Sequence, residues 1–135
     1  MKTLLTLLFI LPFFVFSQKS VIGKTYNLND LEVAQFDFLE PMTYDEAVEA
    51  CSKLGDGWRL PTKEELEEIY ENKSKLGGFL SPVYVSDNSE FFMDNSVYYW
   101  SSSSYGSDYV WVIGFTHKFV AITLKTGYLY ARAVN

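Results

Sequence analysis

The chain of 135 residues carries a formal net charge of −6, and 48% of its residues are hydrophobic, which fits one globular domain. The acidic balance argues against nucleic-acid binding, which needs a basic surface for contacts with phosphates. One cysteine and one histidine exclude an intramolecular disulfide and a zinc site of the usual Cys/His type.

The first 17 residues have the pattern of a signal peptide. Lys2 precedes an apolar run, Leu4 to Phe16, that is too short to span a bilayer comfortably. Compact residues stand at positions −3 and −1 of a cut before Gln18. We therefore expect an exported protein, periplasmic or secreted, in which residues 18–135 form a single domain without a stable membrane anchor. An uncleaved membrane anchor is the alternative.

Two T-x-x-E sequences predict the starts of two helices. Thr43 and Glu46 form the first capping box, and Thr62 and Glu65 form the second. Apolar residues follow both starts at helical spacing, and glycines end both helices. The first helix has Ala47, Val48, Cys51 and Leu54 before Gly55 and Gly57, and the second has Leu66, Ile69 and Tyr70 before Gly77 and Gly78.

The second half of the chain predicts strands. The runs are Val97 to Ser101, Tyr109 to Phe115, Phe119 to Leu124 and Tyr128 to Val134. Tyr109 to Phe115 is apolar on both faces, which is typical of a central strand. Val33 to Leu39 alternates weakly and is expected to form an edge strand. A strand, two helices and an antiparallel meander, in that order, define an α+β fold.

Three short motifs follow one another along the chain. They are Gly55-Asp56-Gly57-Trp58-Arg59-Leu60-Pro61-Thr62 followed by Glu65-Leu66, then Tyr99-Trp100-Ser101-Ser102, and finally Ala131-Arg132-Ala133-Val134. Over roughly Thr43 to Val134 the chain resembles the Lcl C-terminal domain family, a bacterial domain of unknown function that is related to the major paralogous domain proteins. The resemblance implies a C-type-lectin-like fold, with two helices packed on a twisted antiparallel sheet. The family pattern usually ends in V-R-A-V-R, whereas this chain ends in Asn135.

We interpret the motif residues as structural. Trp58 and Leu60 can anchor an extended segment, and Pro61 is preset for a helix start. Arg59 stands between these apolar anchors, so its guanidinium is expected to bind backbone carbonyls or a carboxylate. Ligand contact is the alternative for Trp58, Arg59 and Arg132. The residues assigned to the structural motif are Trp58, Arg59, Leu60, Pro61, Trp100 and Arg132.

Residues that could carry out chemistry are few. His117 is the only candidate general base, and no serine or cysteine nucleophile stands in a recognisable elbow. Cys51 lies on the apolar side of the first helix, which favours a buried thiol over a reactive or intermolecular one. Formylglycine-generating enzymes share the lectin-like fold, but that resemblance implies a catalytic cysteine pair. We therefore expect no enzymatic activity and no cofactor.

Oxygen-bearing side chains that suit Ca²⁺ gather in one predicted loop. They belong to Asp87, Asn88, Ser89, Glu90, Asp94 and Asn95. Their spacing is not that of an EF-hand, and the E-P-N, Q-P-D and W-N-D motifs of sugar-binding C-type lectins are missing from the chain. A solvated loop is expected and no metal site is assigned, although calcium binding stays open.

Aromatic residues give the remaining signal of recognition. Tyr98, Tyr99, Trp100, Tyr105, Tyr109 and Trp111 cluster around a serine-rich run, a combination that is common in recognition surfaces. Burial of half or more of these rings in the sheet is the alternative. Residues 77–95 and 101–108 are expected to be the longest irregular stretches and to lie together, opposite the acidic helices. The predicted binding surface consists of Tyr105, Asp108, Tyr109, Asp87, Asn88 and Glu90.

These expectations describe an exported, non-enzymatic binding module that recognises a glycan or a protein at the bacterial cell envelope or outside the cell. A structural or interaction protein of the envelope, with no small-molecule site, is the alternative. The family is named after a collagen-like adhesin, which suggests polyanionic glycans as ligands. However, the three basic residues after Val97, namely Lys118, Lys125 and Arg132, are too few for strong binding by counterion release.

Overall fold

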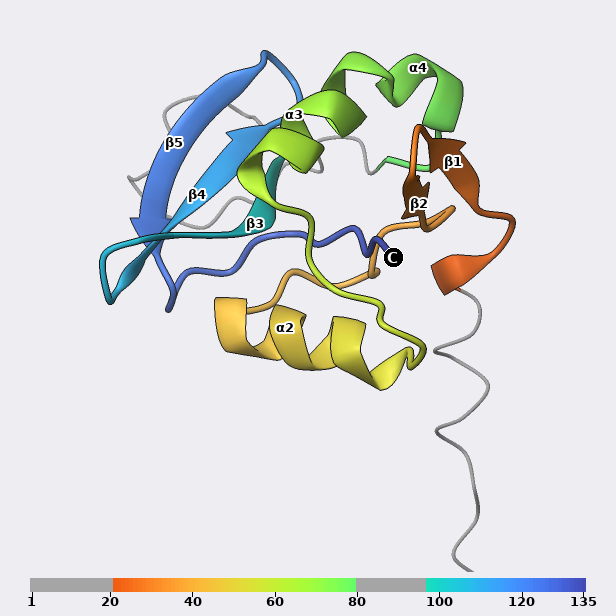
Figure 1. Cartoon of the computed structure of the whole chain (residues 1–135). Coiled ribbons are helices and arrows are strands. Elements are labelled where there is room, and N and C mark those ends of the chain that lie inside the picture. Colours follow the sequence, from red (N-terminus) through yellow and green to blue (C-terminus); the bar gives the residue numbers. More distant parts are fainter. Residues whose placement is uncertain (1–20, 80–96) are drawn as a thin grey trace, which may run out of the picture.

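The computed structural model describes residues 21–79 and 97–135, so the predicted signal peptide and the oxygen-rich loop lie outside the described residues (Figure 1). Its strands are β1 (Tyr26–Leu28), β2 (Leu31–Val33), β3 (Tyr98–Tyr105), β4 (Tyr109–Gly114) and β5 (Phe119–Leu124). Its helices are α2 (Tyr44–Lys53), α3 (Lys63–Glu71) and the single turn α4 (Lys73–Leu76). The order and type of these elements confirm the predicted α+β class.

Both predicted helix starts are confirmed. The Thr43 and Thr62 hydroxyls accept hydrogen bonds from the Glu46 and Glu65 amides at 3.4 and 3.2 Å. The glutamate carboxylates in turn accept the backbone N–H groups of the two threonines at 2.9 and 2.7 Å. Each box satisfies amides that the first turn of a helix leaves without a partner.

The prediction that Val48 belongs to the buried apolar stripe of α2 is wrong. Val48 is 43% exposed, whereas Ala47 and Cys51 are fully buried. Residues four apart on a helix share one face, and the next residue along the chain turns away from it by about 100°. The buried stripe of α2 is therefore narrow, and Val48 lies beyond its border.

The three long strands form an antiparallel sheet in the order β3-β4-β5, with β4 in the centre as predicted. The sequence predicted that the first of these strands ends at Ser101 and that an irregular stretch follows. In the structure β3 continues to Tyr105, so residues 101–105 belong to the strand. The register shifts between Trp100 and Ser104. In this bulge the Ser101 hydroxyl donates to the Trp111 carbonyl at 2.6 Å and accepts the Ser103 amide at 3.2 Å. Serine hydroxyls thus replace missing ladder bonds and let the run stay in the strand.

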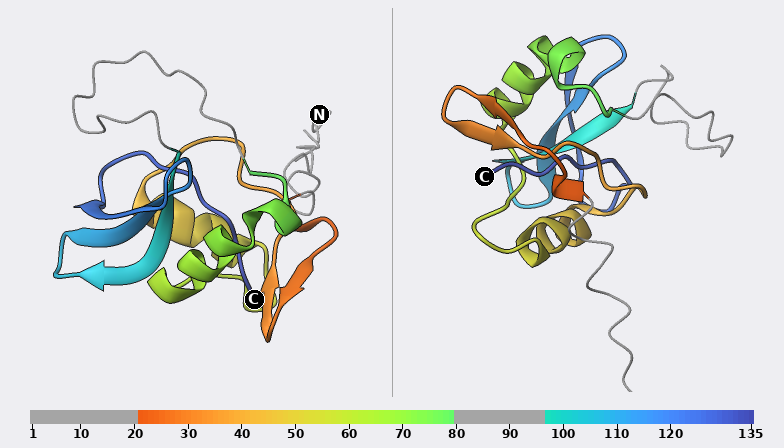
Figure 2. Two further views of the ribbon diagram at one scale, coloured as in Figure 1. Left: turned by 90° about the horizontal axis from the view of Figure 1, so that it is seen from above. Right: turned by 90° about the vertical axis from the view of Figure 1, so that its right-hand side faces the viewer.

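The predicted final strand, Tyr128 to Val134, is wrong as a regular strand of the meander. This segment is extended, but it forms only isolated bridges, of which the one between Tyr99 and Tyr130 is parallel. It bonds in turn to the loop before α2, to β3, to Arg59 and to β2, so no single neighbour forms a continuous ladder with it. Figure 2 shows the C-terminal end of the segment beside the β1–β2 hairpin.

The predicted edge strand from Val33 to Leu39 is also wrong. The strands of this region are β1 and β2, which form a hairpin with Asn29 in the left-handed region at φ 55°. After β2 the burial of side chains is the reverse of what an apolar alternation predicts. The charged residue Asp37 is 3% exposed, whereas the apolar residues Phe36 and Leu39 are 44% and 81% exposed. The buried charge of Asp37 explains why this stretch follows no apolar pattern.

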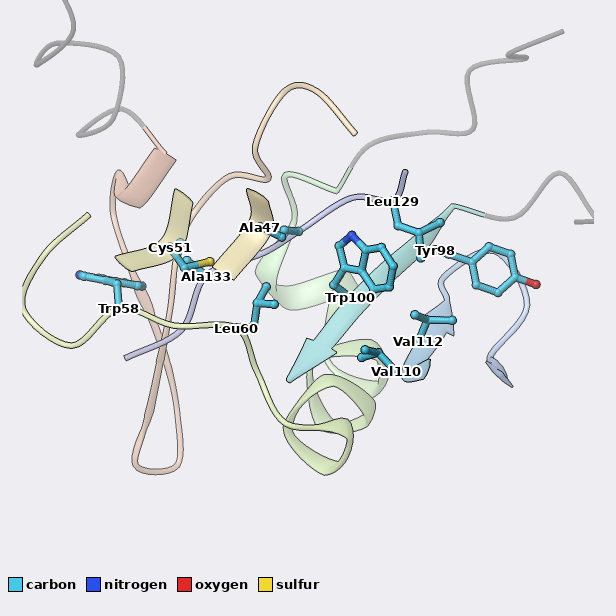
Figure 3. Packing of buried hydrophobic residues seen from close by; sticks show 12 residues of the cluster. Ala47, Cys51, Trp58, Leu60, Tyr98, Trp100, Val110, Val112, Leu129 and Ala133 are labelled. Carbon is cyan, nitrogen blue, oxygen red and sulfur yellow. The ribbon is translucent and has the colours of Figure 1, made fainter. Parts of the chain in front are cut away.

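The core consists of two clusters, one on each face of the sheet. On one face Trp100, Val110 and Val112 pack with Ala47 and Cys51 of α2 (Figure 3). On the other face Leu66 and Ile69 of α3 pack with Tyr99, Ile113 and Phe115, and residues of the β1–β2 hairpin and of the C-terminal segment complete the cluster. The sheet therefore lies between α2 and α3, and each helix covers a different face.

Candidate recognition site

Arg132 lies in a fully buried polar network. Its Nε pairs with Asp37, whose other oxygen accepts a hydrogen bond from the Tyr99 hydroxyl. One terminal nitrogen donates to the Ala34 and Gln35 carbonyls, both at 3.1 Å, and the guanidinium lies 4.0 Å from the ring centroid of Phe79. With both the Arg132 and Asp37 side chains only 1% exposed, this arginine joins backbone segments and presents nothing to solvent.

Arg59 lies at the surface, next to buried members of its motif. Its guanidinium forms a bidentate pair with Glu65 at 2.7 and 2.9 Å and also donates to the Leu60 carbonyl at 3.2 Å. The hydrogen bond from Arg59 lowers the pKa of Glu65, and the same bond raises the pKa of Arg59. Trp58 and Leu60 are buried on either side. Although Arg59 is 47% exposed, its charge is already matched by the capping carboxylate of α3.

The remaining motif residues are buried. Pro61 is fully buried, and Trp100 donates its indole N–H to the Met42 carbonyl at 2.8 Å while its ring meets Tyr44 edge-on.

The structure places Cys51 in the core and His117 at the surface. Burial raises the pKa of the Cys51 thiol to about 12, so it stays protonated and unreactive. His117 is exposed in the turn between β4 and β5. Within residues 21–79 and 97–135, no three His, Cys, Asp or Glu side chains are close enough together to hold a metal ion.

Three of the six predicted ligand-binding residues lie together at the β3–β4 hairpin. Tyr105 and Tyr109 are paired across it, and Asp108 is the last residue of the turn. The two tyrosines are 51% and 43% exposed. The other three, Asp87, Asn88 and Glu90, lie outside the described residues.

The rings named in the sequence divide between core and surface. Tyr98, Tyr99 and Trp100 are buried, Tyr105 and Tyr109 are exposed, and Trp111 is half-buried. Half of the set therefore belongs to the core, as the alternative interpretation held.

An exposed aromatic and apolar surface surrounds the hairpin. Trp111 meets Tyr105 edge-on at 5.4 Å, and Leu124, which is 44% exposed, is paired with Tyr109. Tyr109 and Trp111 are two residues apart in β4, so their side chains leave the same face of the sheet. We refer to Tyr105, Tyr109, Trp111 and Leu124 as the hairpin patch.

Lys63 places a positive charge beside the hairpin patch. Its ammonium group lies 4.6 Å from the ring centroid of Trp111, and its backbone amide donates to the Ser103 hydroxyl at 2.9 Å. The start of α3 thus lies next to the patch, so the prediction of a site opposite both acidic helices is wrong with respect to α3. The sequence did not predict Lys63 or Leu124 as part of this surface. The alternation of β5 could have pointed to Leu124, whereas no sequence signal brings Lys63 to Trp111.

A second surface feature is a polar hollow of about 350 Å³. It is lined by Leu28, Asn29, Asp30, Leu31, Arg59, Glu65, Glu68 and Asn135. Three of its four charged side chains already have partners, because Arg59 pairs with Glu65 and Glu68 accepts a hydrogen bond from Asn29. The hairpin patch, with exposed rings bordered by Lys63, is the better candidate for recognition.

The sheet with one helix on each face and an extended C-terminal segment is a C-type-lectin-like α+β fold. The crystal structure of botrocetin is similar, with a TM-score of 0.53 and 15% sequence identity, over 84% of this chain and 96% of that chain. A model of the Lcl C-terminal domain matches residues 23–135, so the chain belongs to this family. No curated protein matches the chain. Within the described part of the chain, no helix is both long and apolar enough to cross a bilayer.

Proposed function

We propose that the protein is an exported, non-enzymatic binding module that recognises a glycan or a protein at the bacterial cell envelope or outside the cell. Membership of the Lcl C-terminal domain family and the lectin-like fold support a binding role. Export to the periplasm or beyond rests on the signal-peptide pattern of residues 1–17.

The observation that carries the proposal is the hairpin patch. Exposed tyrosine rings offer large apolar contact area at low cost in side-chain entropy, with a hydroxyl at the tip for hydrogen bonds. Lys63 and Asp108 supply one positive and one negative group at its borders. A ligand with both apolar faces and polar substituents, as glycans and protein surfaces have, fits this arrangement.

The test replaces single rings of the hairpin patch. The purified protein is screened on a glycan array and against envelope proteins of the source cell, and every ligand found is measured again with Tyr105→Ala and Tyr109→Ala. Each substitution should weaken binding by more than about 1 kcal/mol, as expected of a ring that contributes to a binding hot spot, while the melting temperature stays nearly constant.

Tyr26→Ala is the matched control, because Tyr26 is an exposed tyrosine of the β1–β2 hairpin, away from β3 and β4. Equal loss of binding in all three variants would contradict a site at the hairpin patch. A screen without any ligand would favour the alternative, a structural or interaction protein of the envelope.

A further inference from the structure

β5 is an edge strand, and its outer side pairs with no other strand among the described residues. The sheet ends at β5, whose register with β4 runs without a shift from Tyr109–Leu124 to Gly114–Phe119. Apart from the turn bond between the Gly127 amide and the Leu124 carbonyl, the backbone of β5 bonds only to β4 among the described residues.

The hydrogen-bond pattern between β4 and β5 shows which backbone N–H and C=O groups of β5 point away from β4. Lys125 N donates to the Asp108 carbonyl at 3.0 Å, so this pair belongs to the bonded set. Bonded and unbonded pairs alternate in an antiparallel ladder. The backbone groups of Thr123, Ala121 and Phe119 therefore bond to β4. The N–H and C=O groups of Val120 and Ile122 point away from β4, toward the outer side.

The sequence of β5 itself has none of the features that usually protect an edge. Natural edge strands carry inward-facing charges, prolines or bulges that prevent pairing with another chain. β5 reads Phe-Val-Ala-Ile-Thr-Leu, with no charge, proline, glycine or bulge. Phe119, Ile122 and Leu124 are 54%, 36% and 44% exposed, so three of its apolar side chains are accessible to solvent.

We propose that β5 pairs with β5 of a second copy of this chain, antiparallel and centred on Ile122. A twofold axis through the Ile122 pair aligns open N–H and C=O groups on both copies and keeps the faces of the two sheets on the same sides. Each Val120 then lies opposite Leu124 of the other copy, and each Ala121 lies opposite Thr123. The apolar rows of the two sheets become continuous across the contact.

The lysines that flank β5 do not face each other in this register. With Ile122 at the centre, Lys125 lies opposite Phe119 and Lys118 lies opposite Thr126 of the second copy, so no like charges face each other directly. Like charges directly opposite in a ladder are destabilising. The pattern from Lys118 to Lys125 is thus compatible with self-pairing in one register.

The size of the contact predicts its strength. Six residues on each copy bury less than the roughly 1,000 Å² expected of a stable interface. We therefore expect a weak dimer whose population rises with concentration.

Sedimentation equilibrium of the purified protein, from about 10 μM to about 1 mM, tests the dimer. The average mass should rise toward twice that of the monomer. Ile122→Lys places two ammonium groups opposite each other and should lower the association constant by at least about tenfold. Ile122→Glu should have the same effect. An equimolar mixture of the two variants should associate again, because lysine then faces glutamate.

Val48→Lys is the matched control, since Val48 is an exposed β-branched residue on α2, away from β5. Thermal unfolding of all variants confirms that they fold. A constant monomer mass up to the highest concentration would overturn the proposal. So would equal weakening by Ile122→Lys and Val48→Lys, or failure of the charge-paired mixture to associate. None of these results depends on the ligand of the hairpin patch.

Discussion

Arg132 connects stretches of backbone that are far apart in the sequence. It bonds to Asp37 and to carbonyls of residues 34, 35 and 77, and no buried side-chain nitrogen or oxygen among the described residues lacks a partner. Charges removed from water are tolerated only when they are paired and hydrogen-bonded. The sequence marked Arg132 as structural, but nothing in it identified Asp37 as its partner, 95 residues away.

Removing either member of this pair should be severe. We expect Arg132→Ala or Asp37→Ala to lower the free energy of unfolding by about 3–5 kcal/mol, because each leaves a buried charge unpaired. Urea unfolding followed by tryptophan fluorescence measures the loss. The double variant Asp37→Leu/Arg132→Met, which removes both charges, should be more stable than either single variant. Single variants as stable as the original protein would contradict the assigned role.

The Arg59–Glu65 pair should matter less and should depend on pH. Arg59 is 47% exposed, so we expect Arg59→Ala to cost only about 1 kcal/mol at pH 7. The pKa of Glu65 is lower in the folded protein than its ordinary value of 4.5. The pair therefore contributes fully above pH 4.5, and its contribution disappears as the pH falls through the lowered pKa of the folded state.

Urea midpoints of the original protein and of Arg59→Ala, measured between pH 7 and pH 2, check this prediction. The gap between the two midpoints should shrink as the solution becomes acidic. Glu65→Gln serves as the control, because Arg59→Ala should have a smaller effect in that background at neutral pH. A gap that is independent of pH would show that packing of the Arg59 side chain, not its charge, stabilises the fold.

Helix starts were predictable and the extent of β3 was not, for a physical reason. A capping box is a local event, in which Thr62 and Glu65 bond to each other's backbone within one turn. The continuation of β3 depends on the Ser101 hydroxyl and the carbonyl of Trp111, ten residues away. Serine alone favours turns over strands, so the partner in β4 decides the outcome.

Ser101→Ala tests whether the bulge depends on this hydroxyl. Ser101 is fully buried, and loss of its hydroxyl removes the acceptor of the Ser103 amide and a donor to the Trp111 carbonyl. We expect a loss of about 1–3 kcal/mol in unfolding free energy. Ser104→Ala, at an exposed position in the same run, should change it by less than about 0.5 kcal/mol. Similar losses in both variants would contradict a special role for Ser101.

At the scale of the whole molecule, the class of fold was predictable but the path of the C-terminal segment was not. Tyr128 to Val134 has the composition of a strand, and the sequence placed it in the meander. In the structure its partners are β2, the loop before α2, Arg59 and β3, which only the tertiary fold brings together. The same holds for the hairpin patch, where Tyr105 and Tyr109 were found from the sequence but Lys63 was not.

The position of this C-terminal segment has a consequence for synthesis of the protein. Leu129, Ala131 and Ala133 belong to the cluster on the α2 face, and Val134 belongs to the cluster on the α3 face. They are made after every other core residue that the structure describes, so neither cluster can be completed before residues 129–134 have left the ribosome. The order of residues along the chain thus makes completion of both core clusters a late event in synthesis.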